Sequence, residues 1–204
     1  ERHNRLIGNV GLNVKFNSHL NLQSFVRTNT YSNENDFRMA SGGLNQDAYS
    51  IVQNTYREMN YESNLMYRNR FGDFSLDGML GANIRTNYYS QLSEATTGGL
   101  SSANYFDIRA SVGRPDIART YNKYQVNSQY ARASFGYKDM AFIDATIRRD
   151  ASSTLPADNN TYIYPSISGS FIFSELTKMA LPWLSYGKIR GNFAQVGADL
   201  APHS

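Results

Sequence analysis

The chain has 204 residues, enough for one domain, but its composition is unusual for a soluble enzyme. Hydrophobic residues make up 41% and charged residues only 18%, whereas tyrosine and phenylalanine, with 15 and 11 copies, are frequent. The net charge of +3 is mild and no dense Lys/Arg run occurs, which argues against a nucleic-acid-binding protein. The chain contains no cysteine, which excludes a disulfide framework and thiolate metal sites.

Regular alternation of apolar and polar residues predicts a strand over residues 5–16. One parity carries Leu6, Val10, Leu12, Val14 and Phe16, and the other carries mainly polar residues and glycine. Such a period of two is typical of a strand with one apolar face. A short polar turn at residues 17–19 predicts a reversal into a second strand over residues 20–31.

The middle of the chain predicts two further strands and two long loops. Residues 32–55 are rich in Asn, Ser and Asp and predict a loop, followed by a strand over residues 56–67 and a short turn. The strand over residues 74–89 alternates most clearly, with Leu76, Leu80, Ala82 and Ile84 opposite Asp77, Asn83 and Arg85. A second long loop is predicted over residues 90–119.

Four more strands are predicted toward the C-terminus. The fifth ends at Tyr137, and a tight Lys138-Asp139 turn leads to the sixth over residues 141–150. A loop over residues 151–161 precedes the seventh strand, residues 162–173. Residues 174–183 predict one helical turn, and residues 184–196 predict the eighth strand. The fold class expected is therefore all-β, an antiparallel meander of about eight strands.

The lengths of the connections alternate between short and long, so that one end of the sheet carries tight turns and the other carries large loops. Outer-membrane β-barrels have this asymmetry, with short turns in the periplasm and long loops outside. The apolar parity should then face lipid and the polar parity the lumen. The lumen-facing candidates are Asp77, Asn83, Arg85, Arg132, Asp144, Arg148 and Arg190.

Arg148 and Arg149 are adjacent and should therefore point to opposite faces of their strand. By parity, Arg148 faces inward with Asp144, and Arg149 faces outward with Ile143 and Ile147. Arg149 lies at the loop end of the strand, on the outer-leaflet side. Two interpretations stay open, a charge that snorkels to water and a contact with lipopolysaccharide phosphates, which arginine binds bidentately.

Aromatic residues cluster near the strand ends, as in the two aromatic girdles of membrane barrels. The turn-end group comprises Phe16, Tyr67, Phe71, Phe74, Phe135, Tyr137, Phe142, Phe173 and Trp183. The loop-end group comprises Tyr31, Tyr56, Tyr88, Tyr89, Tyr121, Tyr162 and Tyr164. The alternative is that these residues cap the core of a β-sandwich.

Catalytic and metal sites find little support. Asp144 and Asp150 lie six residues apart on one face, about 20 Å at strand rise, too far for either glycosidase geometry. The histidines His3, His19 and His203 are isolated from one another and from carboxylate clusters. Asp158-Asn159-Asn160 lacks the spaced ligands of a calcium loop. We expect no cofactor, no metal and no enzymatic activity.

Neither a long apolar run of ~20 residues nor a signal peptide is present. The chain starts at Glu1 without methionine and stops at Ser204 shortly after a strand-like run. We therefore expect it to be an internal piece of a longer exported protein.

Several motifs resemble the SusC/RagA family of TonB-dependent outer-membrane transporters. Residues 137–150, YKDMAFIDATIRRD, followed by Ala151-Ser152-Ser153, are similar to the family pattern Y-K-D-K-Y-L-(L)-x-A-T-(L/I)-R-R-D-G-S-S. The family's later motifs are matched, in order, by residues 164–168 (YPSIS), 174–175 (SE) and 188–197 (KIRGNFAQVG). Residues 78–83 (GMLGAN) and 98–100 (GGL) resemble earlier ones. The departures are Ala151 in place of glycine and Ser170-Phe171 in place of Gly-Trp.

The resemblance covers residues 56–204 closely and the first fifty residues only in style. It implies a barrel of about 22 strands with an N-terminal plug, of which this chain would hold about eight strands and no plug. It implies import of glycans, oligosaccharides or peptides driven by TonB through an upstream region. It also implies a SusD-like lipoprotein partner, nutrient uptake as the function, and the outer membrane of a Gram-negative bacterium as the location.

Two alternatives stay open at the level of sequence. Eight strands could close into a small self-contained outer-membrane barrel. A soluble, carbohydrate-binding β-sandwich would instead need two sheets packed over a dry core.

Overall fold

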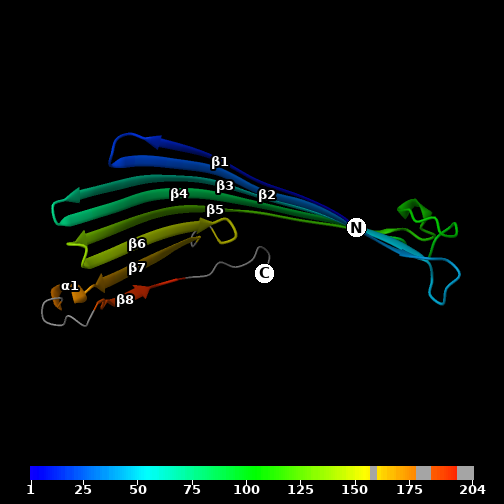
Figure 1. Cartoon of the computed structure of the whole chain (residues 1–204). Coiled ribbons are helices and arrows are strands. Elements are labelled where there is room, and N and C mark those ends of the chain that lie inside the picture. Colours follow the sequence, from blue (N-terminus) through cyan, green and yellow to red (C-terminus); the bar gives the residue numbers. More distant parts are fainter. Residues whose placement is uncertain (157–159, 178–184, 197–204) are drawn as a thin grey trace. The chain divides into compact units, whose positions relative to one another are not determined.

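The computed structural model describes residues 1–156, 160–177 and 185–196, and these form one eight-stranded antiparallel sheet with the strand order β1 to β8 (Figure 1). The strands are β1 (Arg2–Lys15), β2 (Leu20–Met39), β3 (Ala48–Phe71), β4 (Phe74–Ala95), β5 (Asp116–Tyr137), β6 (Ala141–Ser152), β7 (Thr161–Phe171) and β8 (Ile189–Ala194). Every strand pairs with its neighbours in sequence, which confirms the predicted all-β meander.

The tight turns lie where the sequence predicts them, after β1, β3 and β5. Lys138 and Asp139 are the central residues of a β-turn in which the Met140 amide donates to the Tyr137 carbonyl at 2.9 Å, and both have positive φ, 51° and 55°, as in a type I′ turn. The neighbouring turn after β3 is tied to this one, because the Lys138 amide donates to the Asp73 carbonyl at 2.8 Å and Arg70 forms an ion pair with Asp139.

The long loops are shorter than the sequence predicts. The prediction of a loop over residues 32–55 was wrong, because β2 continues to Met39 and β3 starts at Ala48. The prediction for residues 90–119 was also too wide, because β4 continues to Ala95 and β5 starts at Asp116. Polar residues can form the backbone hydrogen bonds of a sheet just as apolar residues can. A polar strand, however, shows no alternation of hydrophobic residues from which it could be predicted.

The C-terminal elements follow the prediction with shifted ends. The short helix α1 (Ser174–Thr177) occupies the start of the predicted helical turn, and β8 is shorter than predicted. The predictions for Trp183, His203 and Asp158-Asn159, and the end of the motif at Gly197, fall outside the described residues.

The chain forms two compact units, each made of segments from several strands. The first comprises residues 1–8, 27–59 and 86–124, and the second comprises residues 9–26, 60–85 and 125–204. The first unit contains the two long loops, and the second contains the tight turns and the hairpins of β5 to β8.

The register of β5, β6 and β7 separates an apolar face from a polar face in the second unit. On one face, Phe135 pairs with Ile143, and Ala131, Ile147 and Pro165 lie side by side. On the other face, Arg132, Thr146 and Ser166 lie side by side, as do Ser134, Asp144 and Ser168. Residues directly opposite in an antiparallel pair share a face, so the alternation seen in the sequence is carried across the sheet.

The apolar face is not covered by another part of the described chain. Leu80 is 62% exposed and Ile143 is 55% exposed, and the buried hydrophobic residues of the described part are only Leu100, Ala110 and Val126. The described residues therefore contain no second sheet and no dry core of the kind a β-sandwich needs. In the described part β1 and β8 are the two edge strands, so a small closed eight-stranded barrel is not formed either.

Among the described residues, no helix has the length and apolar character to cross a membrane.

The exposed apolar face leads to a first prediction for the full-length protein. On the sequence prediction that this face contacts lipid, Leu80→Arg should destabilise the protein by roughly 1–3 kcal/mol, because the arginine would enter the apolar band of the membrane between its centre and its rim. Met79→Arg, one residue away on the opposite face, should cost less than about 1 kcal/mol, because that side chain borders a polar pocket. Denaturant unfolding in detergent or lipid measures both free energies. Equal costs for the two variants would contradict the assignment of the faces.

Candidate functional site

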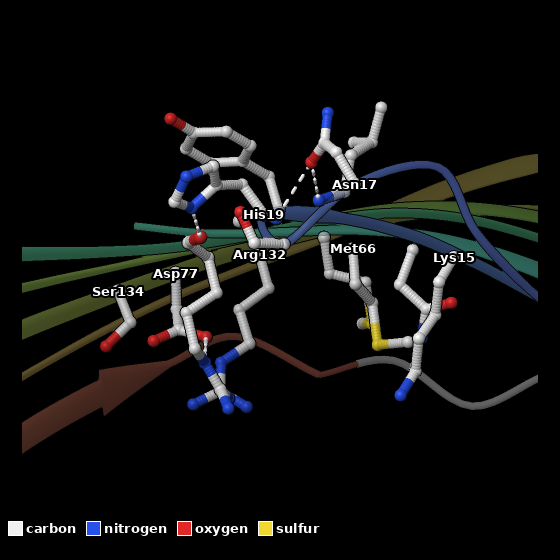
Figure 2. A pocket seen from close by; sticks show the side chains of 14 residues that line it. Lys15, Asn17, His19, Met66, Asp77, Arg132 and Ser134 are labelled. Carbon is white, nitrogen blue, oxygen red and sulfur yellow. Dashed lines mark hydrogen bonds and ion pairs between the residues drawn. The ribbon is translucent and has the colours of Figure 1, made fainter. Parts of the chain in front are cut away.

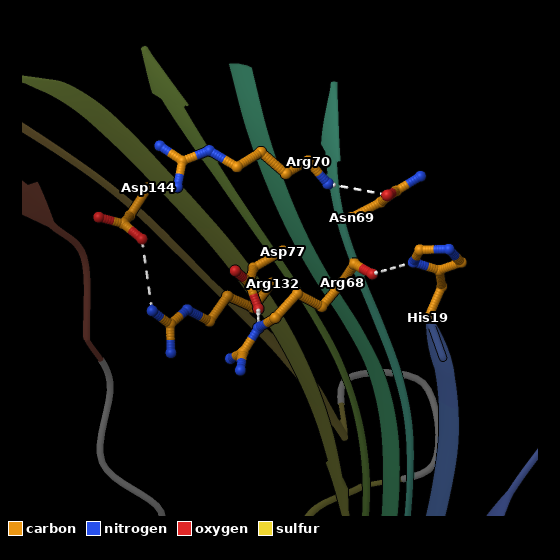
Figure 3. A network of polar contacts seen from close by, with 7 residues as sticks. All are labelled: His19, Arg68, Asn69, Arg70, Asp77, Arg132 and Asp144. Atoms are coloured by element: carbon orange, nitrogen blue, oxygen red, sulfur yellow. Dashed lines mark hydrogen bonds and ion pairs between the residues drawn. The ribbon is translucent and has the colours of Figure 1, made fainter. Parts of the chain in front are cut away.

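The polar face of the second unit carries a series of charged pairs between neighbouring strands (Figure 3). Arg68 on β3 contacts Asp77 on β4, with Nε and Oδ1 2.6 Å apart, and Arg132 on β5 contacts Asp144 on β6 at 3.3 Å. Arg68 is 81% exposed at its side chain, so each pair contributes little to stability. The pairs do fix the direction of the side chains, and they keep both signs of charge on one face.

A pocket of about 540 Å³ opens beside these pairs, at the end of the sheet that carries the tight turns (Figure 2). Three cationic side chains line it, those of Lys15, Arg68 and Arg132, against one carboxylate, that of Asp77. Lys15 has no ion-pair partner among the described residues. Such an excess of positive charge in a concave site attracts carboxylate and other anionic groups.

His19 is held in this pocket by hydrogen bonds to the backbone. Its Nδ1 lies 3.0 Å from the Arg68 carbonyl oxygen, and because a carbonyl can only accept, Nδ1 carries the hydrogen (Figure 3). The Asn17 side chain accepts from the backbone amides of His19 and Leu20, both at 2.8 Å, and so shapes the turn that presents the ring. The remaining imidazole nitrogen, Nε2, is therefore an acceptor when the ring is neutral.

A second polar cluster of the same unit is organised by Tyr130 on β5. Its hydroxyl donates to Asn64 Oδ1 at 2.7 Å, and Asn64 in turn donates to Glu62 at 2.7 Å. The Arg148 guanidinium lies 5.7 Å from the Tyr130 ring centre and donates to Asp150 at 2.8 Å and to Ser128 at 3.0 Å. Partners on β3, β5 and β6 thus fix a single arrangement of this face.

Gly81 on β4 makes room for that cluster. A Cβ atom at Gly81 would lie 2.0 Å from Tyr130 Cε2 and 2.6 Å from Asn64 Oδ1, so the tyrosine ring lies directly over the glycine. Any side chain at this position would displace the ring.

In the first unit, aromatic rings stack among polar residues. His3 and Tyr31 have ring centres 6.2 Å apart, and Tyr31 and Tyr56 have centres 5.0 Å apart and nearly parallel planes. The Tyr56 hydroxyl lies 2.8 Å from Oδ1 of Asn87, which is only 2% exposed. In the second unit, Tyr162 and Tyr164 stack at 6.3 Å.

These contacts correct the expected girdle at the loop end. Tyr162 and Tyr164 pair in register with Asp150 and Arg148, and Tyr31 and Tyr56 interact with polar partners, so these four rings do not lie on an apolar face. The tyrosine hydroxyl needs a hydrogen-bond partner, which the polar face supplies. At the turn end, Phe74 does pack against Phe135 and Tyr137, with ring centres 5.5 and 4.9 Å apart.

The two long loops of the first unit are braced against each other by Asp47. The Ser41 hydroxyl donates to Asp47 Oδ2 at 2.5 Å, and the Leu100 amide donates to Oδ1 at 3.0 Å. Gly99, with φ of +89°, allows this approach, because a Cβ there would lie 2.7 Å from the carboxylate. The hydroxyl bond first, and then the Leu100 amide bond, lower the pKa of Asp47.

The structure gives the surroundings of each residue proposed from the sequence. Asp77, Arg132 and Asp144 take part in the charged pairs, and Arg148 pairs with Asp150. Asn83 is half-buried, with an Oδ1 that lacks a partner in the described part, and Arg85 is exposed. Arg190 on β8 pairs in register with Ser170, and Arg149 lies between Gln129 and Ile163 on the apolar face.

Sequence reasoning missed Lys15, His19, Arg68, Asn64, Tyr130 and Asp47. The alternation along β3 could have indicated three of these positions, because the polar residues Glu62, Asn64 and Arg68 lie on the same face of the strand. The Asp47 brace left no such signal, since it joins loops that are 53 residues apart in the sequence. Among the described residues, no group of three or more His, Cys, Asp or Glu side chains could hold a metal ion.

Comparison with solved structures shows what this fold is similar to. The structure of the RagAB peptide transporter matches with a TM-score of 0.77 and 13% sequence identity, over 94% of this chain and 22% of that chain. The RagAB peptide importer matches in its closed-closed state (TM-score 0.74, 16% identity, 94% and 22% covered) and in its open-open state (TM-score 0.71, 16% identity, 91% and 21% covered).

This chain therefore spans about a fifth of the length of those chains. At such identities the likeness shows the fold alone. The sequence matches no protein-family model and no curated protein.

Gly81 gives a second prediction. Gly81→Ala should destabilise the full-length protein by about 1–3 kcal/mol, because the methyl group overlaps the Tyr130 ring and forces it off Asn64. Gly78→Ala on the same strand meets no atom within 4 Å and is the matched control, expected within about 0.5 kcal/mol of wild type. Unfolding in denaturant measures both. If the two variants lose the same stability, the Tyr130 cluster is not packed as described.

Asp47 gives a third prediction. Its pKa is lower in the folded state than the usual 3.8, so the brace is complete above that pH and is lost as the pH falls through the lower, folded-state value. In Asp47→Asn, hydrogen exchange at the Leu100 amide should be several-fold faster at neutral pH, and its protection should no longer change with acid. Asp73→Asn, in a tight turn, should leave that amide unchanged. Unaltered protection in Asp47→Asn would show that the carboxylate does not hold the loop.

Proposed function

We propose that this chain is part of the barrel wall of a TonB-dependent outer-membrane transporter of the SusC/RagA type. The observation that carries the proposal is the single sheet whose exposed apolar face has no protein cover in the described residues and whose other face is polar and cross-linked by hydrogen bonds. A membrane barrel is the setting in which both faces are satisfied, one by lipid and one by water and polar ligands.

Two independent observations support the same conclusion. The motifs at residues 137–150, 164–168 and 188–197 resemble the family in order and spacing. The fold is similar to a part of the RagAB peptide transporter, with a TM-score of 0.77. The sequence motifs and the strand arrangement are different kinds of evidence, so their agreement strengthens the proposal. The remaining strands of a barrel of about 22, and the plug, would come from other parts of the protein.

Strand length supports an orientation with the long loops outside. β3 has 24 residues, a contour of roughly 80 Å at strand rise, whereas crossing a bilayer takes about 9–11 residues. In the first unit, β2 beyond residue 32 carries Glu34, Asp36 and Arg38 on one parity and Asn33 and Asn35 on the other. Because one parity is fully charged there and the other begins with two asparagines before Phe37 and Met39, this part of β2 and its hairpin partner β3 would project into water.

The proposed cargo is an oligomeric nutrient, a glycan, oligosaccharide or peptide, taken up with a SusD-like lipoprotein over the loops and with energy from TonB through an upstream region. The pocket with Lys15, Arg68 and Arg132 would line the lumen near the periplasmic end, where it can contact the plug or an anionic cargo group. The carboxylates Asp77 and Asp144 of this face are engaged in ion pairs with Arg68 and Arg132, and we assign no catalytic role to any polar group of this face.

Epitope insertion into the full-length protein tests the topology, which gives a fourth prediction. A tag at Gly42, in the loop after β2, should be detected on intact cells, because the loop lies outside and no atom would crowd a side chain there. A tag at Gly72, in the turn after β3, should be detected only after the outer membrane is opened. Fractionation should place both proteins in the outer membrane. The reverse pattern of detection would refute the orientation, and a soluble protein would refute the barrel.

The same tagged proteins test transport. A strain that lacks the protein should fail to grow on its oligomeric nutrient but should grow on the monomers, and the Gly42-tagged protein should restore growth. A panel of glycans and peptides identifies the cargo. Normal uptake of every oligomer by the deletion strain would contradict the proposed function.

A further inference from the structure

The apolar face of the second unit ends along a stepped line across three strands, which is level on β5 and β6 and lies one side-chain step farther along on β7. On β5 the outward residues change from Ala131 to Gln129, and on β6 they change from Ile147 to Arg149. On β7 they change from Ile163 to Thr161. Gln129, Arg149 and Ile163 are direct neighbours in register, so the boundary between apolar and polar side chains passes through Arg149.

The height of this line fits the edge of a bilayer. Ala141, at the turn end of β6, and Arg149 are eight residues apart, about 27 Å along the strand. With the usual strand tilt of ~35–45°, that is about 20 Å along the membrane normal, close to the ~25 Å height of the apolar band of outer-membrane barrels. Arg149 therefore lies at the outer rim of the band and not at its centre.

Arg149 is free to bind an anion. Its only described contact is a hydrogen bond to the Thr161 hydroxyl at 3.4 Å, and it has no carboxylate partner among the described residues. The adjacent Arg148, by contrast, is bound to Asp150 and Ser128. The Gln129 amide flanks Arg149 on β5, so donor groups from two strands meet at the rim. The Thr161 hydroxyl accepts from Arg149 and donates to Asn160 Oδ1 at 3.0 Å, and so orients the guanidinium.

An apolar groove lies directly below this charge. Leu80, Ala131 and Ile147 line it together with Gln129 and Arg149, and its volume is about 340 Å³. The small Ala131 side chain, across from Ile147 in register, leaves the depression between β4 and β6. A ligand that fits both parts must carry an anionic head and a hydrocarbon chain that points into the bilayer.

We propose that Arg149 and Gln129, with Thr161 orienting the guanidinium, bind a phosphate of an outer-leaflet glycolipid of the lipopolysaccharide type, with one acyl chain in the groove of Leu80, Ala131 and Ile147. The guanidinium matches a phosphate bidentately, and at the membrane rim the pair is partly shielded from water. The inference rests on the proposed outer-membrane location and adds a lipid site to it. The glycolipid is the occupant that supplies both the phosphate and the chain at this height.

Binding of lipid A to the full-length protein in phosphatidylcholine nanodiscs tests the site. The probes are bisphosphorylated lipid A and the same lipid without its phosphates, and native mass spectrometry measures the lipid retained. Wild type should bind the phosphorylated form about tenfold more tightly, as expected for a charged hydrogen-bonded pair. Arg149→Gln should remove most of that difference, and Arg149→Lys should keep only part of it, because lysine retains the charge without the fork.

Arg148→Gln is the matched control, since it removes the neighbouring charge from the opposite face and should leave lipid A binding unchanged. Ala131→Trp should weaken binding by filling the groove while Arg149 stays in place, and it tests the site even if Arg149→Gln fails to assemble. Inorganic phosphate at millimolar concentration should not displace the lipid.

Three outcomes would overturn the proposal: equal binding of the two lipid A forms by wild type, equal losses in Arg148→Gln and Arg149→Gln, or displacement by free phosphate. If the protein retains phosphatidylglycerol as well as it retains lipid A, the site binds anionic lipids without specificity, which would also count against the proposal. If the protein fractionates with the outer membrane but fails these tests, only the proposed lipid site is refuted. If the protein does not reach the outer membrane, the proposed function itself is refuted.

Discussion

The register of the β-meander is the constraint on which the rest of this structure depends. Side chains alternate with a period of two, so a slip by one residue between two strands would exchange their faces. In the hairpin of β5 and β6, such a slip would bring Arg148 and Asp144 next to Phe135 and Ala131 on the apolar side. The tight turn at Lys138 and Asp139, with its two positive φ angles, fixes the pairing at one end. The pair of Arg132 and Asp144 and the Tyr130 cluster reinforce it on the polar face.

A sheet with this register cannot bury its apolar face within the described chain. Leu80, Ile143 and Phe193 are all more than half exposed. Leaving an aliphatic or aromatic side chain in water forfeits about 1.5–3 kcal/mol, and the stability of a domain is only about 5–15 kcal/mol. About half a dozen such residues would therefore equal the whole margin. The apolar face consequently needs an external cover, and a lipid bilayer supplies one without requiring a complementary protein surface.

The strands and the tight turns could be predicted from the sequence because both leave local signals. Alternation in residues 74–89 and the Lys138-Asp139 pair gave the β4 strand and the β5–β6 turn. The upper parts of β2 and β3 could not be predicted, because residues 32–36 have the composition of a loop and the adjacent Ile51 and Val52 interrupt the alternation in β3. The rings of Tyr31 and Tyr56 were assigned to the wrong surroundings for a related reason, since position near a strand end does not tell which face a residue occupies.

The candidate site was predicted only in part, and the limit is again physical. Parity assigned Asp77, Arg132 and Asp144 to one face, but their partners depend on the stagger between strands, which no single strand encodes. The contribution of Gly81 is visible only when Tyr130, 49 positions along the chain, lies over it. Asp47 and Leu100 likewise meet only because β2, β3 and β4 carry two loops to the same end.

Arg148 and Arg149 show how the same side chain acquires two different roles on this scaffold. Arg148 has a carboxylate, a hydroxyl and an aromatic ring within reach, so its charge is neutralised inside the protein and orders the polar face. Among the described residues, Arg149 is hydrogen-bonded only to the Thr161 hydroxyl and faces outward beside Ile163, so its charge has no counter-charge in this part of the chain. The effect of a substitution in any of these strands should therefore be compared with the effect of the same substitution two positions away, because that residue lies on the same face. The residue next to it reports on the opposite side of the sheet.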